Sequence, residues 1–221
     1  MSAPSYTGDV ETGGPADVRE LPGLTISKVA VSEMANNAYL LRCTATGEAL
    51  LVDAAAEPET LRALIGDADL RTVVTTHGHW DHHRALSEVV AATGAVTVAH
   101  PADAADLPVP VQRTVEHGDT VSFGKQTLDV VHLRGHTAGS IALVWRGPGD
   151  AGVHVFTGDS LFPGGPGRTT SPTDFTSLMD DLEERIFGRL DDDTWFYPGH
   201  GKDSTLGAER PNLAEWRARG W

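Results

Sequence analysis

Apolar and polar positions alternate along much of the chain in short runs that predict β-strands. In the first half these runs are residues 24–33, 37–43, 48–54, 71–76 and 95–100. Thr46 and Gly47 form a turn between the second and third runs, which predicts an antiparallel meander at the start of the fold. Apolar residues recur at helical spacing in residues 57–66 and 84–94, and Gly94 ends the second of these helices.

The second half repeats this pattern of strands and helices. Its predicted strands are residues 119–123, 126–133, 140–147, 152–159 and 194–200. A long helix is predicted over residues 171–190, with Ser171 as its cap and Pro172 at its first position. Two runs of strands interleaved with helices predict a layered α/β domain, in which two sheets pack together and the helices lie outside.

The start of the chain differs in composition from the rest. Residues 1–20 are rich in glycine, proline, serine and acidic residues, which bury too little apolar surface to order themselves. We therefore expect a flexible tail over residues 1–20. The remaining residues, 21–221, have a length that suits one domain with a sizeable core.

The charge of the chain restricts its partners. Its 31 acidic and 17 basic side chains give a net charge of −14, which argues against nucleic acid or an anionic membrane as partner and leaves a small molecule as the expected substrate. Cys43 is the only cysteine, so the chain has no internal disulfide. The sequence shows neither a leader-like start nor a run of 18 apolar residues, and we expect a cytoplasmic protein. It leaves the oligomeric state open.

Candidate chemistry is concentrated in residues 73–83, VVTTHGHWDHH, directly behind an apolar β-branched run. His77, His79, Asp81 and His82 fall within six residues of a loop, where side chains can converge on one point. Neutral imidazole nitrogens and carboxylate oxygens are the ligands that zinc and iron take. Four such groups in one loop predict a metal site.

Three later segments end in the same way, with a potential ligand at the end of a strand. His136 lies in LRGHTAGS, Asp159 follows a buried strand in VFTGDSLF, and His200 lies in WFYPGHG. A carboxylate at the end of a buried strand is costly unless a positive charge compensates it. With the histidine loop these residues supply seven candidate ligands, which is more than one ion can use and about right for two.

These motifs, taken in order, resemble those of the metallo-β-lactamase fold superfamily. The series T-H-x-H-x-D-H, G-H-T-x-G-S, G-D-S-L-F and P-G-H-G spans residues 37 to about 205 and is similar to that of the glyoxalase II-like hydrolases. The resemblance implies a four-layer αββα sandwich with its metal site at one edge, between the two sheets.

The resemblance also implies which residues bind metal. The first metal would be held by His77, His79 and His136. The second would be held by Asp81, His82 and His200, and Asp159 would bridge the two. Asp53, in LLVDAAA, matches an early aspartate of the family that orients the ligand loop.

Such a centre is expected to be hydrolytic. A metal lowers the pKa of bound water from 15.7 to about 7, so that a hydroxide nucleophile exists at neutral pH. We expect two divalent ions, zinc or else iron, and attack of metal-bridging hydroxide on a small thioester or ester-like substrate, with Asp81 orienting the nucleophile.

Three alternatives stay open. A persulfide dioxygenase resembles the same pattern, with a single ferrous ion on the equivalents of His77, His136 and Asp159. A lactone hydrolase of the same fold is the second. The third is a catalytically silent metal- or partner-binding module, which usually lacks one of the ligands.

The sequence departs from the glyoxalase II pattern in places that concern the substrate. The chain ends 21 residues after His200, where glyoxalase II adds a helical domain that contacts glutathione, and this puts glutathione thioesters in doubt. Arg168 is a candidate contact for an anionic substrate group, and His100, at a strand end, is a candidate for the mouth of the site. Arg134 and Ala138 stand where prolines are common in the family and are expected to reshape the rim of the pocket.

Overall fold

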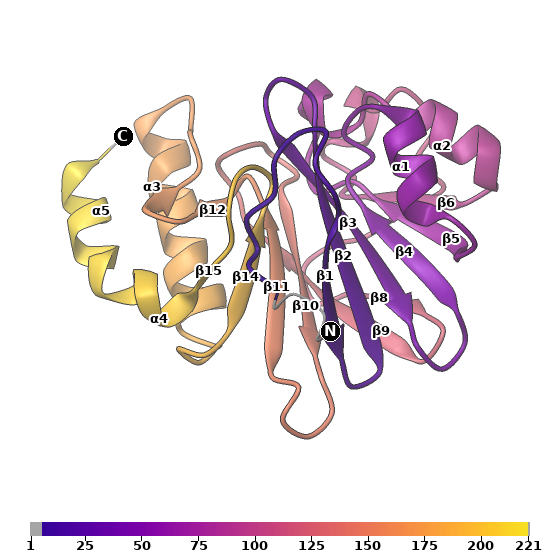
Figure 1. Cartoon of the computed structure of the whole chain (residues 1–221). Helices are drawn as coiled ribbons and strands as arrows, with labels where there is room; N and C mark the ends of the chain where they lie inside the picture. The colour runs from indigo at the N-terminus through magenta and orange to yellow at the C-terminus, as the bar shows by residue number, and fades with distance from the viewer. Residues whose placement is uncertain (1–5, 221) are drawn as a thin grey trace.

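The computed structural model describes residues 6–220, which form two large β-sheets packed face to face between two groups of helices (Figure 1). The strand order of the first sheet is β1 (Asp17–Leu21), β2 (Leu24–Val31), β3 (Asn36–Cys43), β4 (Glu48–Val52), β5 (Asp69–Val74), β6 (Val96–Ala99) and β7 (Arg113–Thr114). Its first four strands are antiparallel and β4 to β7 are parallel.

The second sheet takes its strands from the second half of the chain. Its order is β15 (Ser204–Thr205), β14 (Trp195–Pro198), β11 (Val153–Gly158), β10 (Ile141–Arg146), β9 (Gln126–His132) and β8 (Thr120–Phe123). A two-stranded hairpin of β12 (Leu161–Phe162) and β13 (Gly165–Pro166) follows β11. Within this sheet β11 and β14 are parallel, so both end at the same edge.

The helices cover the outer face of each sheet. On the first sheet lie α1 (Pro58–Ile65) and α2 (Leu86–Thr93). On the second lie α3 (Pro172–Asp181), its π-helical continuation Leu182–Phe187, α4 (Leu206–Glu209) and α5 (Leu213–Arg219). No helix within residues 6–220 has the length and apolar character needed to cross a membrane.

Three apolar clusters bind these layers together. The central one joins the facing sides of the two sheets through residues such as Leu41, Leu50, Leu143 and Phe156, all fully buried. A second cluster lies between the first sheet and α1 and α2, and a third between the second sheet and α3 to α5. This confirms the predicted αββα sandwich, because each sheet is apolar on both faces and each face is covered.

The start of the chain differs from the tail predicted over residues 1–20. Residues 17–21 form β1 and pair with β2. Before them, the Tyr6 hydroxyl donates to Asp203 at 2.6 Å, and the buried Lys28 ammonium donates to the Gly8 carbonyl at 2.7 Å. Polar contacts to distant residues thus supply the order that the composition of this segment does not predict. Residues 1–5 of the predicted tail lie outside the described residues.

Candidate metal centre

The seven candidate ligands follow four strands whose ends meet at one edge of the sandwich. The histidine loop comes directly after β5 in the first sheet, and a 3₁₀ turn over Trp80–His82 carries Asp81 and His82. His136 lies between β9 and β10 of the second sheet. Asp159 and His200 follow β11 and β14, whose parallel pairing brings both to the same side. The fold therefore assembles the site from both sheets.

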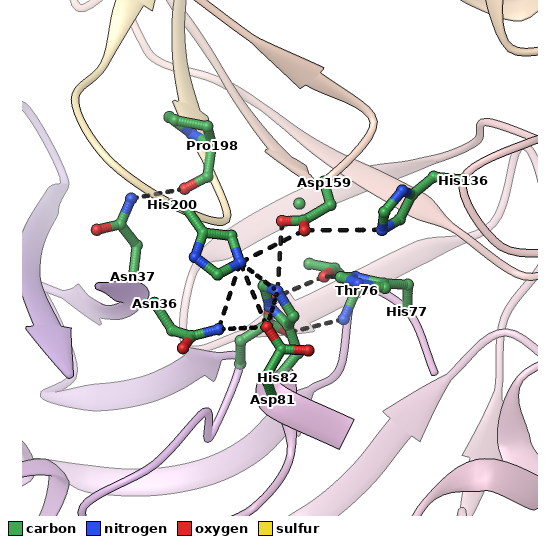
Figure 2. Close-up of polar contacts among 12 residues, drawn as sticks. Asn36, Asn37, Thr76, His77, Asp81, His82, His136, Asp159, Pro198 and His200 are labelled. Carbon is green, nitrogen blue, oxygen red and sulfur yellow. Dashed lines mark hydrogen bonds and ion pairs between the residues drawn. The ribbon is translucent and has the colours of Figure 1, made fainter. Parts of the chain in front are cut away.

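The ligand atoms converge at this edge, and Figure 2 labels six of the seven residues, all except His79. Three groups each have one ligand atom per residue within 4.8 Å of the others. They are His77–His79–His136, His77–His82–Asp159 and Asp81–His82–His200.

Asp159 lies between the outer two groups. Its Oδ2 atom is 3.6 Å from His136 Nε2 and 3.4 Å from His200 Nε2, and its Oδ1 atom is 3.3 Å from His82 Nε2. His200 Nε2 is also 3.4 Å from Asp81 Oδ2. A carboxylate that approaches the imidazoles of both groups can accept a cation on either oxygen.

The rings of His136 and His200 are each oriented by a contact at the nitrogen that faces away from the centre. Nδ1 of His136 lies 2.7 Å from the Arg168 carbonyl, and Nδ1 of His200 lies 2.9 Å from the Met34 carbonyl. A neutral imidazole that donates from Nδ1 has its lone pair on Nε2, the atom that faces the centre. Metal-binding histidines are oriented in this way.

Two buried Nε2 atoms show whether the site suits a metal ion. Within residues 6–220 the buried Nε2 atoms of His77 and His136 have no hydrogen-bond partner. Buried polar atoms are rarely left without a partner, and an orphaned pair needs an explanation. Neutral imidazole nitrogens and carboxylates directed at a common point suit a divalent transition metal, so the residues present fit such ions.

The charges around the centre favour a cation. Burial opposes ionisation of Asp159, but hydrogen bonds from His200 and His82 hold its pKa far below the ordinary value. Burial opposes protonation of His82, yet its contacts with Asp159 and Asp53 raise its pKa to about 10. Burial lowers the pKa of His77 and of His136. The centre thus combines an ionised carboxylate with the imidazoles of His77 and His136, which burial keeps neutral. The imidazoles of His82 and His200 differ, because, despite burial, their carboxylate neighbours raise their pKa.

Asp53 contacts the histidine loop, which the resemblance to the family implies that it orients. Its Oδ1 accepts from the Thr76 amide at 2.7 Å, and its Oδ2 accepts from the Thr76 hydroxyl at 2.8 Å and lies 2.9 Å from His82 Nδ1. The residue is only 2% exposed and has a φ of 58°. These contacts suit an orienting role, which stays a prediction.

Sequence reasoning missed two asparagines at the start of β3. Asn36 is fully buried, and its amide donates to Asp81 Oδ2 at 2.9 Å (Figure 2). Asn37 donates to the carbonyls of Pro198 at 2.9 Å and Gly201 at 2.8 Å, on either side of His200. The available signal was the pair of polar residues that opens an otherwise apolar strand. A third missed residue, Asp103, lies in the loop after β6 and is buried.

The candidate substrate contacts lie in different surroundings. Arg168 lines a cavity of about 450 Å³ beside His136. His100 instead stacks on His132, with the ring centroids 4.1 Å apart. Arg134, expected at the pocket rim, forms a bidentate ion pair with Asp181 of α3, with bonds of 2.8 and 2.7 Å.

The comparisons with known proteins agree with this architecture. Residues 31–200 match the family described as the metallo-beta-lactamase superfamily. A hydroxyacylglutathione hydrolase of Polaromonas sp. is 37% identical over 73% of this chain and 60% of its own length. Including two further relatives of that name, the chain spans only 51–60% of their lengths.

Two solved structures are similar at higher coverage. ETHE1 from Myxococcus xanthus has a TM-score of 0.74 at 30% identity, covering 87% of this chain and 84% of its own. TTHA1623, solved in a di-iron-bound form, has a TM-score of 0.67 at 30% identity, covering 83% of this chain and 96% of its own. The match over residues 31–200, together with the fold and the ordered histidine and aspartate motifs, shows that the chain belongs to the metallo-beta-lactamase superfamily.

Proposed function

We propose that this protein hydrolyses a small thioester or ester-like substrate with the help of two divalent metal ions, most simply zinc. The observation that carries the proposal is the complete set of seven ligands, held with their ligand atoms in groups no wider than 4.8 Å. A preassembled centre of this kind is what metal-dependent hydrolysis requires. The similarity to hydroxyacylglutathione hydrolases supports the choice of a thioester.

In this proposal the ions divide the ligands as the motifs suggest. His77, His79 and His136 would hold the first ion, Asp81, His82 and His200 the second, and Asp159 would bridge them. Bound there, the ions would polarise the substrate carbonyl and make water acidic enough to attack it at neutral pH.

The chain's own residues would orient the reacting groups. Asn36 holds Oδ2 of Asp81, which also approaches His200 Nε2 at 3.4 Å. We therefore assign Oδ1 of Asp81 to accept a hydrogen bond from the attacking water. A fixed acceptor at this position lowers the barrier by orienting the nucleophile before reaction.

Two cavities flank the centre and would receive the two ends of a substrate. The cavity of about 450 Å³ beside His136 is lined by Arg168 and Arg219, residues whose guanidinium groups suit an anionic group. A second cavity, of about 530 Å³, is lined by Met34 and Trp80, both of which are exposed, and the Met34 carbonyl contacts His200. Two arginines beside the site would give an otherwise acidic protein a local preference for anionic substrates.

The proposal is tested by metal analysis together with turnover. We expect about two ions per chain, and hydrolysis of a hydroxyacylglutathione thioester that is lost on chelation and regained with zinc. His79→Ala and Asp159→Ala are expected to abolish turnover and lower metal content while the protein stays soluble. His117→Ala, at an exposed histidine outside the centre, is the matched control.

The alternatives predict different results. One iron per chain with oxygen consumption on a persulfide would favour the dioxygenase, and turnover of lactones alone would favour the lactone hydrolase. Full turnover and unchanged metal content in His79→Ala or Asp159→Ala would refute the dinuclear assignment.

A further inference from the structure

Asp103 accepts hydrogen bonds from two loops that are far apart in the sequence. Its Oδ2 accepts from the Gly78 amide at 2.8 Å and from the Thr137 hydroxyl at 2.5 Å, and its Oδ1 accepts from the Gly139 amide at 2.7 Å. The residue lies in the loop after β6 and is only 3% exposed. Hydrogen bonds to an ionised acceptor are stronger and shorter than neutral ones, so this contact is a firm link between the loops.

Both loops carry ligands of the first metal group. Gly78 lies between His77 and His79 in the loop after β5, which belongs to the first sheet. Thr137 follows His136 in the loop between β9 and β10, which belongs to the second sheet. One carboxylate therefore connects the two sheets at the point where their ligands must come within reach of a single ion.

The backbone of the loop between β9 and β10 packs tightly against the Asp103 carboxylate. A Cβ atom at Gly139 would lie 2.7 Å from Cγ of Asp103 and 2.9 Å from its backbone nitrogen. The glycine thus allows the loop of the second sheet to approach Asp103 more closely than any other residue could. The Thr137 hydroxyl also lies 2.7 Å from the Ser140 hydroxyl, which orients it.

We infer that Asp103 is a positioning residue for the metal centre, which sets the distance between His136 and the pair His77 and His79. The apolar core between the sheets holds them together, but apolar contacts are non-directional and tolerate small shifts. Three directional hydrogen bonds at the ligand loops remove that freedom. This inference rests on the metal-dependent function proposed above.

The test compares two carboxylates of the same chemistry. Asp17 also accepts from two backbone amides and a threonine hydroxyl, those of Thr7 and Gly8, each at 2.9 Å, but binds no ligand loop. Zinc affinity of the metal-free protein is measured by competition with a chromophoric chelator, for the wild type, Asp103→Asn and Asp17→Asn. We expect Asp103→Asn to weaken the first site by about 10- to 100-fold and Asp17→Asn to leave it unchanged.

Two further measurements separate positioning from general stability. The visible absorption of the cobalt-substituted protein, which reports ligand geometry, should change in Asp103→Asn only. If Asp103→Asn fails to fold, Thr137→Val removes a single hydrogen bond of the same link and should weaken zinc binding in the same direction but by less.

The outcomes discriminate between the inference and the function on which it rests. Wild-type affinity in Asp103→Asn, or in Thr137→Val where that variant replaces it, would overturn the positioning role. So would equal losses in Asp103→Asn and Asp17→Asn. Absence of zinc or iron binding by the wild type would instead overturn the proposed function, and the inference with it.

Discussion

Replacing Asp53 by asparagine tests whether this residue orients the ligand loop. Asparagine has nearly the shape of aspartate and tolerates a positive φ, so the φ of 58° at this position is retained. What changes is that one carboxylate oxygen, an acceptor, becomes an NH₂ group, a donor. Both oxygens face donors in the structure, the Thr76 amide at one and the Thr76 hydroxyl and His82 Nδ1 at the other.

Each of the two orientations of the side-chain amide that Asp53→Asn introduces would disrupt a different contact. If the NH₂ group faces the Thr76 amide, a buried backbone donor loses its acceptor, at about 1–3 kcal/mol of folding free energy. If it faces His82, Nδ1 must become an acceptor and the proton moves to Nε2, the atom that would bind metal. We therefore expect metal affinity at the second site to fall by about 10- to 100-fold, the usual effect of losing such a partner.

The assay combines chelator competition, which gives the affinity for each of the two ions, with urea unfolding of the metal-free protein. Asp129→Asn is the control, since Asp129 forms only a half-exposed ion pair with Arg146 and should change neither quantity appreciably. Unchanged affinity in Asp53→Asn, together with an unfolding free energy within about 0.5 kcal/mol of the wild type, would refute the orienting role.

Two further predictions concern pH and packing. Burial lowers the pKa of His154 from 6.5 to about 4. Between these two pH values the unfolded chain therefore binds a proton at this residue and the folded protein does not. The free energy of unfolding should fall on acidification below about pH 6.5, by up to about 3 kcal/mol. Metal-free His154→Gln should lose less stability between about pH 7.5 and 5 in urea unfolding, and equal losses would contradict this. A Cβ at Gly199 would lie 2.0 Å from Oδ1 of Asp159, so Gly199→Ala should displace that carboxylate and lower metal content in elemental analysis; full content would show that the turn adapts.

Local sequence signals predicted most of the strands and pointed to the candidate ligands. Strand periodicity identified most of the two sheets, and histidines placed directly after strands were correctly expected to converge. The motif order supplied the αββα arrangement, which the three apolar clusters confirm. The strand and helix signals are local because each depends on neighbouring residues along the chain, whereas the layered arrangement came from the resemblance of the ordered motifs to a family.

Long-range polar contacts could not be predicted in this way. Tyr6 and Asp203 are 197 residues apart, and the fully buried ion pair of Lys28 with Asp203 has no periodic signature. The same holds for Asp103, whose partners lie 25 to 36 residues away in two different loops. The helices within residues 206–219 also escaped prediction, since α4 and α5 are only four and seven residues long and too short for a clear helical period.

Several polar contacts that could not be predicted from the sequence join the two sheets beside the candidate ligands. Asn37 and Tyr39, on β3 of the first sheet, both donate to the Pro198 carbonyl beside His200, at 2.9 and 2.6 Å. At the other end of the ligand set, Asp103 joins the loop after β5 to the loop after β9. Because the ligands come from both sheets, the distances between them depend on how the sheets sit relative to each other. Directional hydrogen bonds at both ends of the ligand set fix the position of one sheet relative to the other, which the non-directional contacts of the apolar core cannot do.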